Sequence, residues 1–219
     1  MISRELRQRI LSSAILIPLC IFFINQGGFI FNISLLILFT MSVYEWIKMN
    51  KKIIFYFFGT LFLSFSFIST FILRNNFEEK GQLLIFFLIL IGISTDLGGY
   101  IFGKLLKGPK FSKISPNKTY SGILGSYIIS IFFVNFLLQN LSLFYELKLS
   151  FNINIILLIF ILSTISQLGD LVISYFKRLS NLKDTGKLIP GHGGLLDRID
   201  GLIFIFPLFY IFNLLFKIL

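Results

Sequence analysis

LLIFFLILIGISTDLGGYIF, residues 83–102, shows which kind of fold the chain adopts. A helix of about 20 mostly apolar residues covers the roughly 30 Å hydrocarbon core of a bilayer. Similar apolar runs alternate with short polar stretches at residues 10–25, 29–47, 53–73, 120–138, 153–173 and 201–219. Because lipid offers backbone groups no hydrogen-bond partners, such runs must be helical. The sequence therefore predicts an all-α integral membrane protein with about seven transmembrane helices.

The composition supports this prediction. Hydrophobic residues make up 56% of the chain and charged residues only 14%, whereas soluble domains are about one quarter charged. We found no internal repeat or linker, so residues 1–219 are expected to form a single polytopic membrane domain. No small-residue cleavage site follows the cationic start, so the first helix is expected to be retained. The single cysteine, Cys20, allows no intrachain disulfide and no cysteine metal cluster.

The basic residues are distributed unevenly between alternate polar segments. If the N-terminus is cytoplasmic and seven helices alternate, nearly all lysines and arginines fall on the cytoplasmic side. The exceptions are Arg74, Lys80, Lys148 and Lys217. This asymmetry agrees with the positive-inside rule and places two polar loops, residues 103–119 and 174–200, on the cytoplasmic face. Because the basic residues flank membrane helices, membrane lipids and not nucleic acid are the expected partners.

Asp96 and Asp170 stand out inside predicted spans, where an ionised side chain costs at least ~2.5 kcal/mol. Asp170 is near the cytoplasmic end of its span. Asp96 lies deeper, beside Gly98 and Gly99, small residues that permit close helix packing or an irregular backbone. Ionisable groups inside a membrane are functional by default. The alternative is that each carboxylate is protonated or paired with a lysine and only holds helices together.

Residues 174–200, SYFKRLSNLKDTGKLIPGHGGLLDRID, combine cations, carboxylates and glycines in one predicted loop. Asp197 and Asp200 stand three residues apart, so on a helix they share a face and could hold Mg²⁺ through oxygen ligands. The glycine turn around His192 can present backbone N–H groups to an anion. A metal ion with several cations is what phosphoryl or nucleotidyl transfer requires. The absence of Walker A and Gly-x-Gly-x-x-Gly sequences excludes the common soluble nucleotide folds.

The motifs of this loop resemble the C-terminal signature of the phosphatidate cytidylyltransferase, or CDP-diacylglycerol synthase, family. The resemblance rests on S-x-F-K-R at 174–178, K-D-x-G at 183–186 and P-x-H-G-G-x-x-D-R-x-D at 190–200. A second block of the family is similar to D-x-x-G-Y-x-x-G-K at 96–104 and I-S-P-x-K-T-x-x-G at 114–122. Arg9 with Glu45-Trp46 fits the N-terminal region of the family.

The sequence departs from the family pattern at a few positions. Gly99 stands where alanine is usual, Tyr120-Ser121 where tryptophan is followed by glutamate or glutamine, and Ile173 where many members have an acidic residue. Ser121 and Ile173 therefore leave two polar roles of the family unfilled. The chain is also shorter than many members, so one or two spans are expected to be missing from its N-terminal half.

The resemblance implies that CTP and phosphatidate react to give CDP-diacylglycerol and pyrophosphate in phospholipid biosynthesis. It implies a divalent metal, Mg²⁺, with a second metal ion left open. The residues expected in catalysis are Asp170, Asp197, Asp200, Lys177, Arg178 and Arg198, and the three aspartates are also the expected metal ligands. The residues expected to bind substrate are Asp96, Ser115, Lys118, Thr119, Ser174, Lys183, Asp184, Lys187, His192, Gly193 and Gly194. His192 is expected to orient phosphate or pack the turn rather than act as a base.

Phosphatidate keeps its acyl chains in the bilayer while CTP arrives from the cytosol. The expected location is therefore the bacterial inner (cell) membrane, with multiple spans and the active site facing the cytoplasm. One alternative is another CTP-dependent lipid-phosphate transferase or a lipid kinase, which the metal and cations alone would permit. A second is a small cation- or proton-coupled transporter that uses Asp96 and Asp170, although it would not need a loop so rich in phosphate-binding groups. The oligomeric state is left open, a homodimer included.

Overall fold

The computed structural model describes residues 4–50, 52–112, 114–116, 118–140 and 153–216. The helices of this part of the chain are α1 (Arg4–Gln26), α2 (Gly28–Met49), α3 (Ile53–Asn75), α4 (Glu78–Leu106), α5 (Tyr120–Asn140), α6 (Ile153–Leu179), α7 (Leu196–Ile199) and α8 (Leu202–Phe216). Six of them, α1 to α6, are long and apolar enough to cross a membrane, and α8 is a shorter apolar helix. The prediction of an all-α integral membrane protein is confirmed, and about seven spans is close to the observed number.

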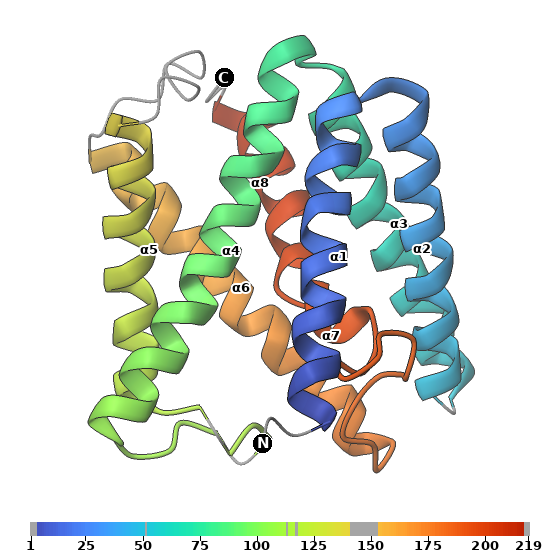
Figure 1. Cartoon of the computed structure of the whole chain (residues 1–219), viewed down its shortest axis with the longest axis vertical. Coiled ribbons are helices and arrows are strands. Elements are labelled where there is room, and N and C mark those ends of the chain that lie inside the picture. The colour runs from blue at the N-terminus through green and yellow to red at the C-terminus, as the bar shows by residue number, and fades with distance from the viewer. Residues whose placement is uncertain (1–3, 51, 113, 117, 141–152, 217–219) are drawn as a thin grey trace.

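Each predicted apolar run corresponds to one of the long helices or to α8, and the helices pack side by side as a bundle (Figure 1). The start of α1, the turn between α2 and α3, and the segments that follow α4 and α6 lie at one end, drawn at the bottom of Figure 1. The end of α8 lies at the other. The two polar loops therefore meet at one end of the bundle, while the side of the membrane that this end faces stays a prediction.

The apolar core lies where α4, α6 and α8 meet. Its fully buried side chains include Leu84, Leu88, Ile91, Ile159, Leu162 and Phe209. Other apolar side chains, such as Ile128 and Phe132 of α5, are exposed on the outside of the bundle. Lipid tails are as apolar as leucine, so close packing rather than removal from water holds such helices together. The exposed apolar faces fit a surface covered by lipid.

Glycines bring α4 and α5 into close contact. A side chain at Gly98 would clash with the carbonyl oxygen of Gly125, and one at Gly125 would clash with Phe102. Small residues at such contacts are typical of helix pairs in membranes. α4 stays helical through this region, so the glycines serve close packing and not an irregular backbone. This contact fixes Asp96, two residues before Gly98, next to α5.

Candidate active site

A polar cavity of about 260 Å³ lies between α4, α5, α6 and the segment that precedes α5. Five of the predicted site residues line it: Asp96, Ser115, Lys118, Thr119 and Asp170. The cavity thus joins the second motif block to the aspartate of α6, although the two are about fifty positions apart in the sequence. Ser126 and Gln167, which the motifs did not indicate, also line its wall.

Lys118 and Asp170 form an ion pair in this cavity. The ammonium nitrogen of Lys118 lies 2.5 Å from Asp170 Oδ2 and donates a hydrogen bond to the backbone carbonyl oxygen of Gln167 at 3.1 Å. The side chains of Lys118 and Asp170 are 22% and 30% exposed, so a ligand in the cavity can reach both. A lysine partner stabilises an ionised carboxylate inside a membrane helix. Here the ion pair also lines the open cavity.

Asp200, directly after α7, places a second carboxyl group beside that of Asp170. The two groups lie close enough to share a proton, and Ser174 Oγ lies 3.5 Å from Asp170 Oδ1. Burial, together with the neighbouring Asp170 carboxylate, raises the pKa of Asp200 well above its ordinary value. Adjacent carboxylates repel each other when both are ionised, so they share a proton or bind a cation. Their oxygen atoms are suitable ligands for a divalent ion.

Asp197 belongs to a different network, although it stands only three residues before Asp200. Its Oδ1 accepts a hydrogen bond from Lys177 at 2.8 Å, and its Oδ2 accepts the backbone N–H groups of Thr185 and Gly194 at 2.8 and 3.0 Å. In the described part of the chain, no three His, Cys, Asp or Glu side chains are arranged to hold a metal ion. The metal role of Asp197 stays a prediction, and its contacts indicate that it fixes the loop.

The glycine turn is held mainly by its own backbone and by α1. Gly191 and Gly193 have φ values of 77° and 89°, which favour glycine. The N–H groups of His192 and Gly194 donate to Ile189 and Asp197 within the loop, so these two are not directed at an anion. Gly193 packs against Asp184 and Asp197. The turn therefore shapes the loop before α7.

His192 connects this turn to α1. Its Nδ1 lies 2.6 Å from Ser12 Oγ and its Nε2 lies 3.3 Å from Ser13 Oγ. Arg9 Nε donates to the carbonyl oxygen of Gly191 at 2.9 Å. Partial burial lowers the pKa of His192, and the nearby charges of Arg198 and Arg9 lower it further. These contacts agree with a packing role for His192 and not with a base in the polar cavity. Ser12 and Ser13 carried no motif in the sequence.

The remaining predicted residues are exposed. Arg178 is in the last turn of α6, and Lys183, Asp184 and Lys187 are on the segment between α6 and α7. Arg178 donates to the carbonyl oxygen of Leu182 at 3.0 Å, and the exposed Arg198 donates to that of His192 at 2.6 Å. The segment between α6 and α7 lies at the same end of the bundle as the segment between α4 and α5, which carries Lys118 of the polar cavity (Figure 1). The exposed residues themselves do not line this cavity. Their cationic groups are accessible to an anionic solute.

The two departures from the family motif have structural partners. Ser121 Oγ accepts a hydrogen bond from the N–H group of Gly108 at 3.2 Å and lies 3.0 Å from Thr119 Oγ1, which in turn accepts the N–H group of Gly122 at the start of α5. Ile173 is 3% exposed and packs in an apolar cluster with Trp46. Ser121 thus helps to hold the loop before α5, and Ile173 stabilises packing.

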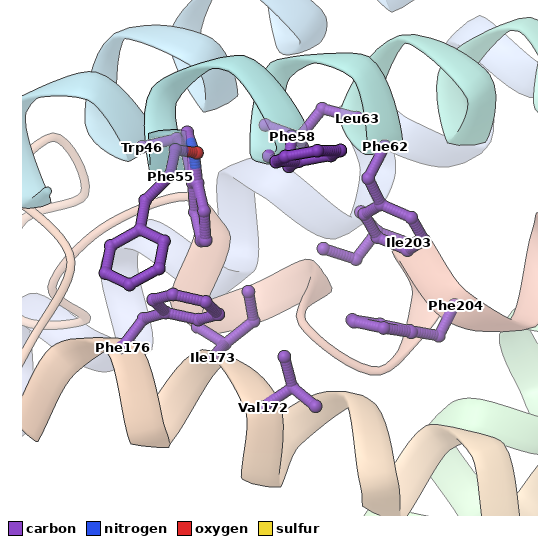
Figure 2. A pocket seen from close by; sticks show the side chains of 11 residues that line it. Trp46, Phe55, Phe58, Phe62, Leu63, Val172, Ile173, Phe176, Ile203 and Phe204 are labelled. Carbon is purple, nitrogen blue, oxygen red and sulfur yellow. The ribbon is translucent and has the colours of Figure 1, made fainter. Parts of the chain in front are cut away.

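An apolar groove of about 200 Å³ lies on another face of α6. Figure 2 shows Val172, Ile173 and Phe176 of α6 facing aromatic side chains of α3, with Phe204 of α8 beside them. The polar cavity is lined instead by Gln167 and Asp170 of the same helix. α6 therefore separates a polar cavity from an apolar groove, as expected of a helix at a boundary between polar groups and lipid.

Glu45 of α2 fits the family pattern, but the sequence assigned it no role at the site. Its side chain is buried, at 1% exposure, and accepts hydrogen bonds from the N–H groups of Leu195 and Leu196, each at 2.9 Å. Thr185 Oγ1 donates to it at 3.0 Å. Glu45 lies within the predicted 29–47 span, so a third carboxylate in an apolar run was the signal that could have identified it.

The fold and the site together define a class: a multi-pass helical membrane protein with paired carboxylates and cations at one end of its bundle. The chain belongs to the cytidylyltransferase family, whose model matches residues 50–216.

Curated relatives carry a more specific name. The chain is similar to the phosphatidate cytidylyltransferase of Brucella suis biovar 1 (strain 1330), with 38% identity over 159 residues, 72% of this chain and 56% of that protein. It is 43% identical over 135 residues to that of Staphylococcus haemolyticus (strain JCSC1435), covering 60% of this chain and 49% of the relative. The chain spans about half the length of the curated relatives it matches.

Proposed function

We propose that the chain is a phosphatidate cytidylyltransferase, which converts CTP and phosphatidate into CDP-diacylglycerol and pyrophosphate. The observation that carries the proposal is the group of Lys118, Asp170 and Asp200 at the polar cavity. It combines a cation for phosphate with a carboxylate pair for a metal ion, and Asp170 lies on α6, a helix that can cross a membrane. Relatives that carry this name, at 38% to 44% identity, support the same activity.

In the proposed reaction, a phosphate oxygen of phosphatidate attacks the α-phosphorus of CTP. A bond forms between that oxygen and the α-phosphorus, the bond to the oxygen bridging the α- and β-phosphates breaks, and pyrophosphate leaves with the bridging oxygen. A phosphate monoester is already a nucleophile at neutral pH, so no general base is required. Lys118 is positioned to bind a phosphate oxygen in the cavity. The exposed cations Arg178, Lys183, Lys187 and Arg198 are available to the triphosphate.

The carboxyl pair fits a divalent ion. Mg²⁺ is usually bound by one or two carboxylates together with substrate phosphates and water, and Asp170 with Asp200 supplies two. A bound Mg²⁺ would neutralise charge on the phosphate oxygens as the bond to the leaving group breaks. Occupation of the pair would also displace the proton that the raised pKa of Asp200 favours. Asp197 would act by holding Lys177 and the loop.

The position of the site suits a substrate with one part in lipid and one in water. The segment between α4 and α5, which carries Lys118 of the polar cavity, and the cation-rich loop lie at the same end of the bundle (Figure 1), beside helices with lipid-compatible faces. Together with the predominance of basic residues at this end, this supports an active site at the cytoplasmic face of the bacterial inner membrane. Phosphatidate would then enter from the membrane and CTP from the cytosol.

Position-specific labels in CTP test the reaction. Detergent-purified protein is incubated with Mg²⁺, CTP labelled at either the α- or the γ-phosphate, and phosphatidate, diacylglycerol or another lipid phosphate. We expect the α-label to enter lipid only with phosphatidate, with one pyrophosphate released per product. Transfer of the γ-label to diacylglycerol would identify a lipid kinase instead. Equal incorporation with an unrelated lipid phosphate would contradict the proposed substrate.

A further inference from the structure

The loop between α6 and α7 is fixed by a carboxylate from a distant helix. Glu45, on α2, is 140 positions from Thr185 and 151 from Leu196, yet it hydrogen-bonds to both. Leu195, the residue before α7, has no side-chain cap of its own. The carboxylate of Glu45 takes this place, since it accepts the N–H groups of Leu195 and Leu196 that the helix leaves unpaired.

Glu45 is also linked to Lys177 through two side chains. Thr185 Oγ1 lies 3.0 Å from Glu45 Oε2 and 3.1 Å from Asp197 Oδ2. Asp197 Oδ1 accepts the hydrogen bond from Lys177. A continuous chain of polar contacts therefore runs from α2 to α6 through the loop. Such networks hold a single geometry when their members are satisfied.

Two glycines of the loop make room for this carboxylate. A Cβ atom at Gly186 would lie 2.5 Å from Glu45 Oε1, and one at Gly194 would lie 2.6 Å from Glu45 Oε2. Neither glycine has a positive φ value. The space taken by Glu45, and at Gly194 also by the hydroxyl of Thr185, therefore accounts for these glycines rather than their backbone conformation. The carboxylate of Glu45 and the two glycines, Gly186 and Gly194, therefore pack together closely.

We infer that Glu45 is the positioning residue of this loop and that it holds the loop in the conformation that binds the triphosphate of CTP. The inference rests on the proposed function for the identity of the nucleotide. Glu45 would act through Thr185 and Asp197 on Lys177 and on the orientation of the loop that carries Lys183 and Lys187. It would not touch the nucleotide itself.

Glu45→Gln tests the inference because it preserves size but places an NH₂ group against N–H or O–H donors. We expect the KM for CTP to rise about tenfold or more, as for loss of a buried charge-assisted hydrogen bond, with the KM for phosphatidate nearly unchanged. Trypsin should cleave after the exposed Lys183 and Lys187 about tenfold faster, since cleavage requires loop opening. Tyr44→Phe, at the exposed neighbouring position, should match the wild type in both measurements.

A second pair of variants tests the inference independently in case Glu45→Gln does not fold. Thr185→Val removes the shared hydroxyl and should reproduce the rise in KM for CTP, whereas Thr185→Ser should restore the wild-type value. Wild-type KM and trypsin rates in both Glu45→Gln and Thr185→Val would overturn the inference, as would equal changes in the KM values of both substrates. If the wild type binds CTP but forms no CDP-diacylglycerol, only the proposed function is contradicted. The inference about Glu45 is then tested by comparing the CTP affinity of the variants instead of their KM. A wild type that does not bind CTP would overturn both.

Discussion

His192 is positioned by hydroxyl groups of α1, and its neutral form suits this environment. Ser12 and Ser13 contact its two ring nitrogens, while Arg9 and Arg198 lie close enough to oppose a positive charge. Partial burial of the ring, together with the charges of Arg198 and Arg9, therefore holds the pKa of His192 below its ordinary value near 6.5 in the folded protein. Protonation weakens the connection between α1 and the loop.

The sign of the pH dependence follows from that shift. A group with a lower pKa in the folded state contributes stability above the pKa of the unfolded state and loses it as the pH falls through the folded-state value. We expect the thermal midpoint to fall between pH 7.5 and 5.5 by more in the wild type than in His192→Gln. The difference should be small, because a half-buried group is screened by solvent. Identical pH profiles in a detergent melting assay would contradict the role of His192.

The sequence predicted individual site residues better than the contacts that these residues make. It identified Asp96 and Asp170 from their cost in a membrane, and both line the polar cavity. It also expected Asp197 and Asp200 to act together, since three residues separate them. In the structure, Asp197 accepts a hydrogen bond from Lys177, whereas Asp200 lies beside Asp170. Sequence spacing shows which residues share a helix face, but it does not show which side chains from distant parts of the chain contact them.

Among the secondary-structure elements, the contact between α4 and α5 is the most sensitive to side-chain size. Gly98 and Gly99 are adjacent, yet a Cβ at Gly98 would meet the backbone of Gly125, while a Cβ at Gly99 would meet only the side-chain hydroxyl of Ser126 at 2.9 Å, which can rotate if it gives up its hydrogen bond to the Thr95 carbonyl oxygen. Gly98→Ala should therefore destabilise the protein by about 1–3 kcal/mol, the usual cost of overpacking, and Gly99→Ala by clearly less. Unfolding in mixed detergent micelles measures both, and equal losses would rule out this packing.

The long helices could be predicted because membrane spans are defined by length and hydropathy alone. Every predicted run became a helix, although α1 begins at Arg4 rather than residue 10 and α6 continues to Leu179 rather than ending at residue 173. The short helix α7 and the loop before it could not be predicted. Their conformation depends on Glu45 of α2, Lys177 of α6 and Arg9 of α1, contacts that no local pattern encodes.

For the whole molecule, the charge asymmetry predicts that the end with the polar loops faces the cytoplasm. In a Cys20→Ser background, single cysteines at Lys52 and Lys107 report on this end, and one at Lys80 reports on the other. We expect a membrane-impermeant maleimide to label position 80 in intact cells and positions 52 and 107 only after permeabilisation. The opposite pattern would place the site outside, away from cytosolic CTP.

We propose that Lys118, Asp170 and Asp200 form the reaction centre for cytidylyl transfer. The rate of CDP-diacylglycerol formation from CTP and phosphatidate tests this in purified wild type, Asp170→Asn and Lys80→Gln, a control at the opposite end of the bundle. We expect Asp170→Asn, although folded, to lose at least about 100-fold in rate, as when a preorganised electrostatic group is removed, while Lys80→Gln keeps the wild-type rate. A folded Asp170→Asn protein that turns over at the wild-type rate would show that Asp170 is not part of the reaction centre.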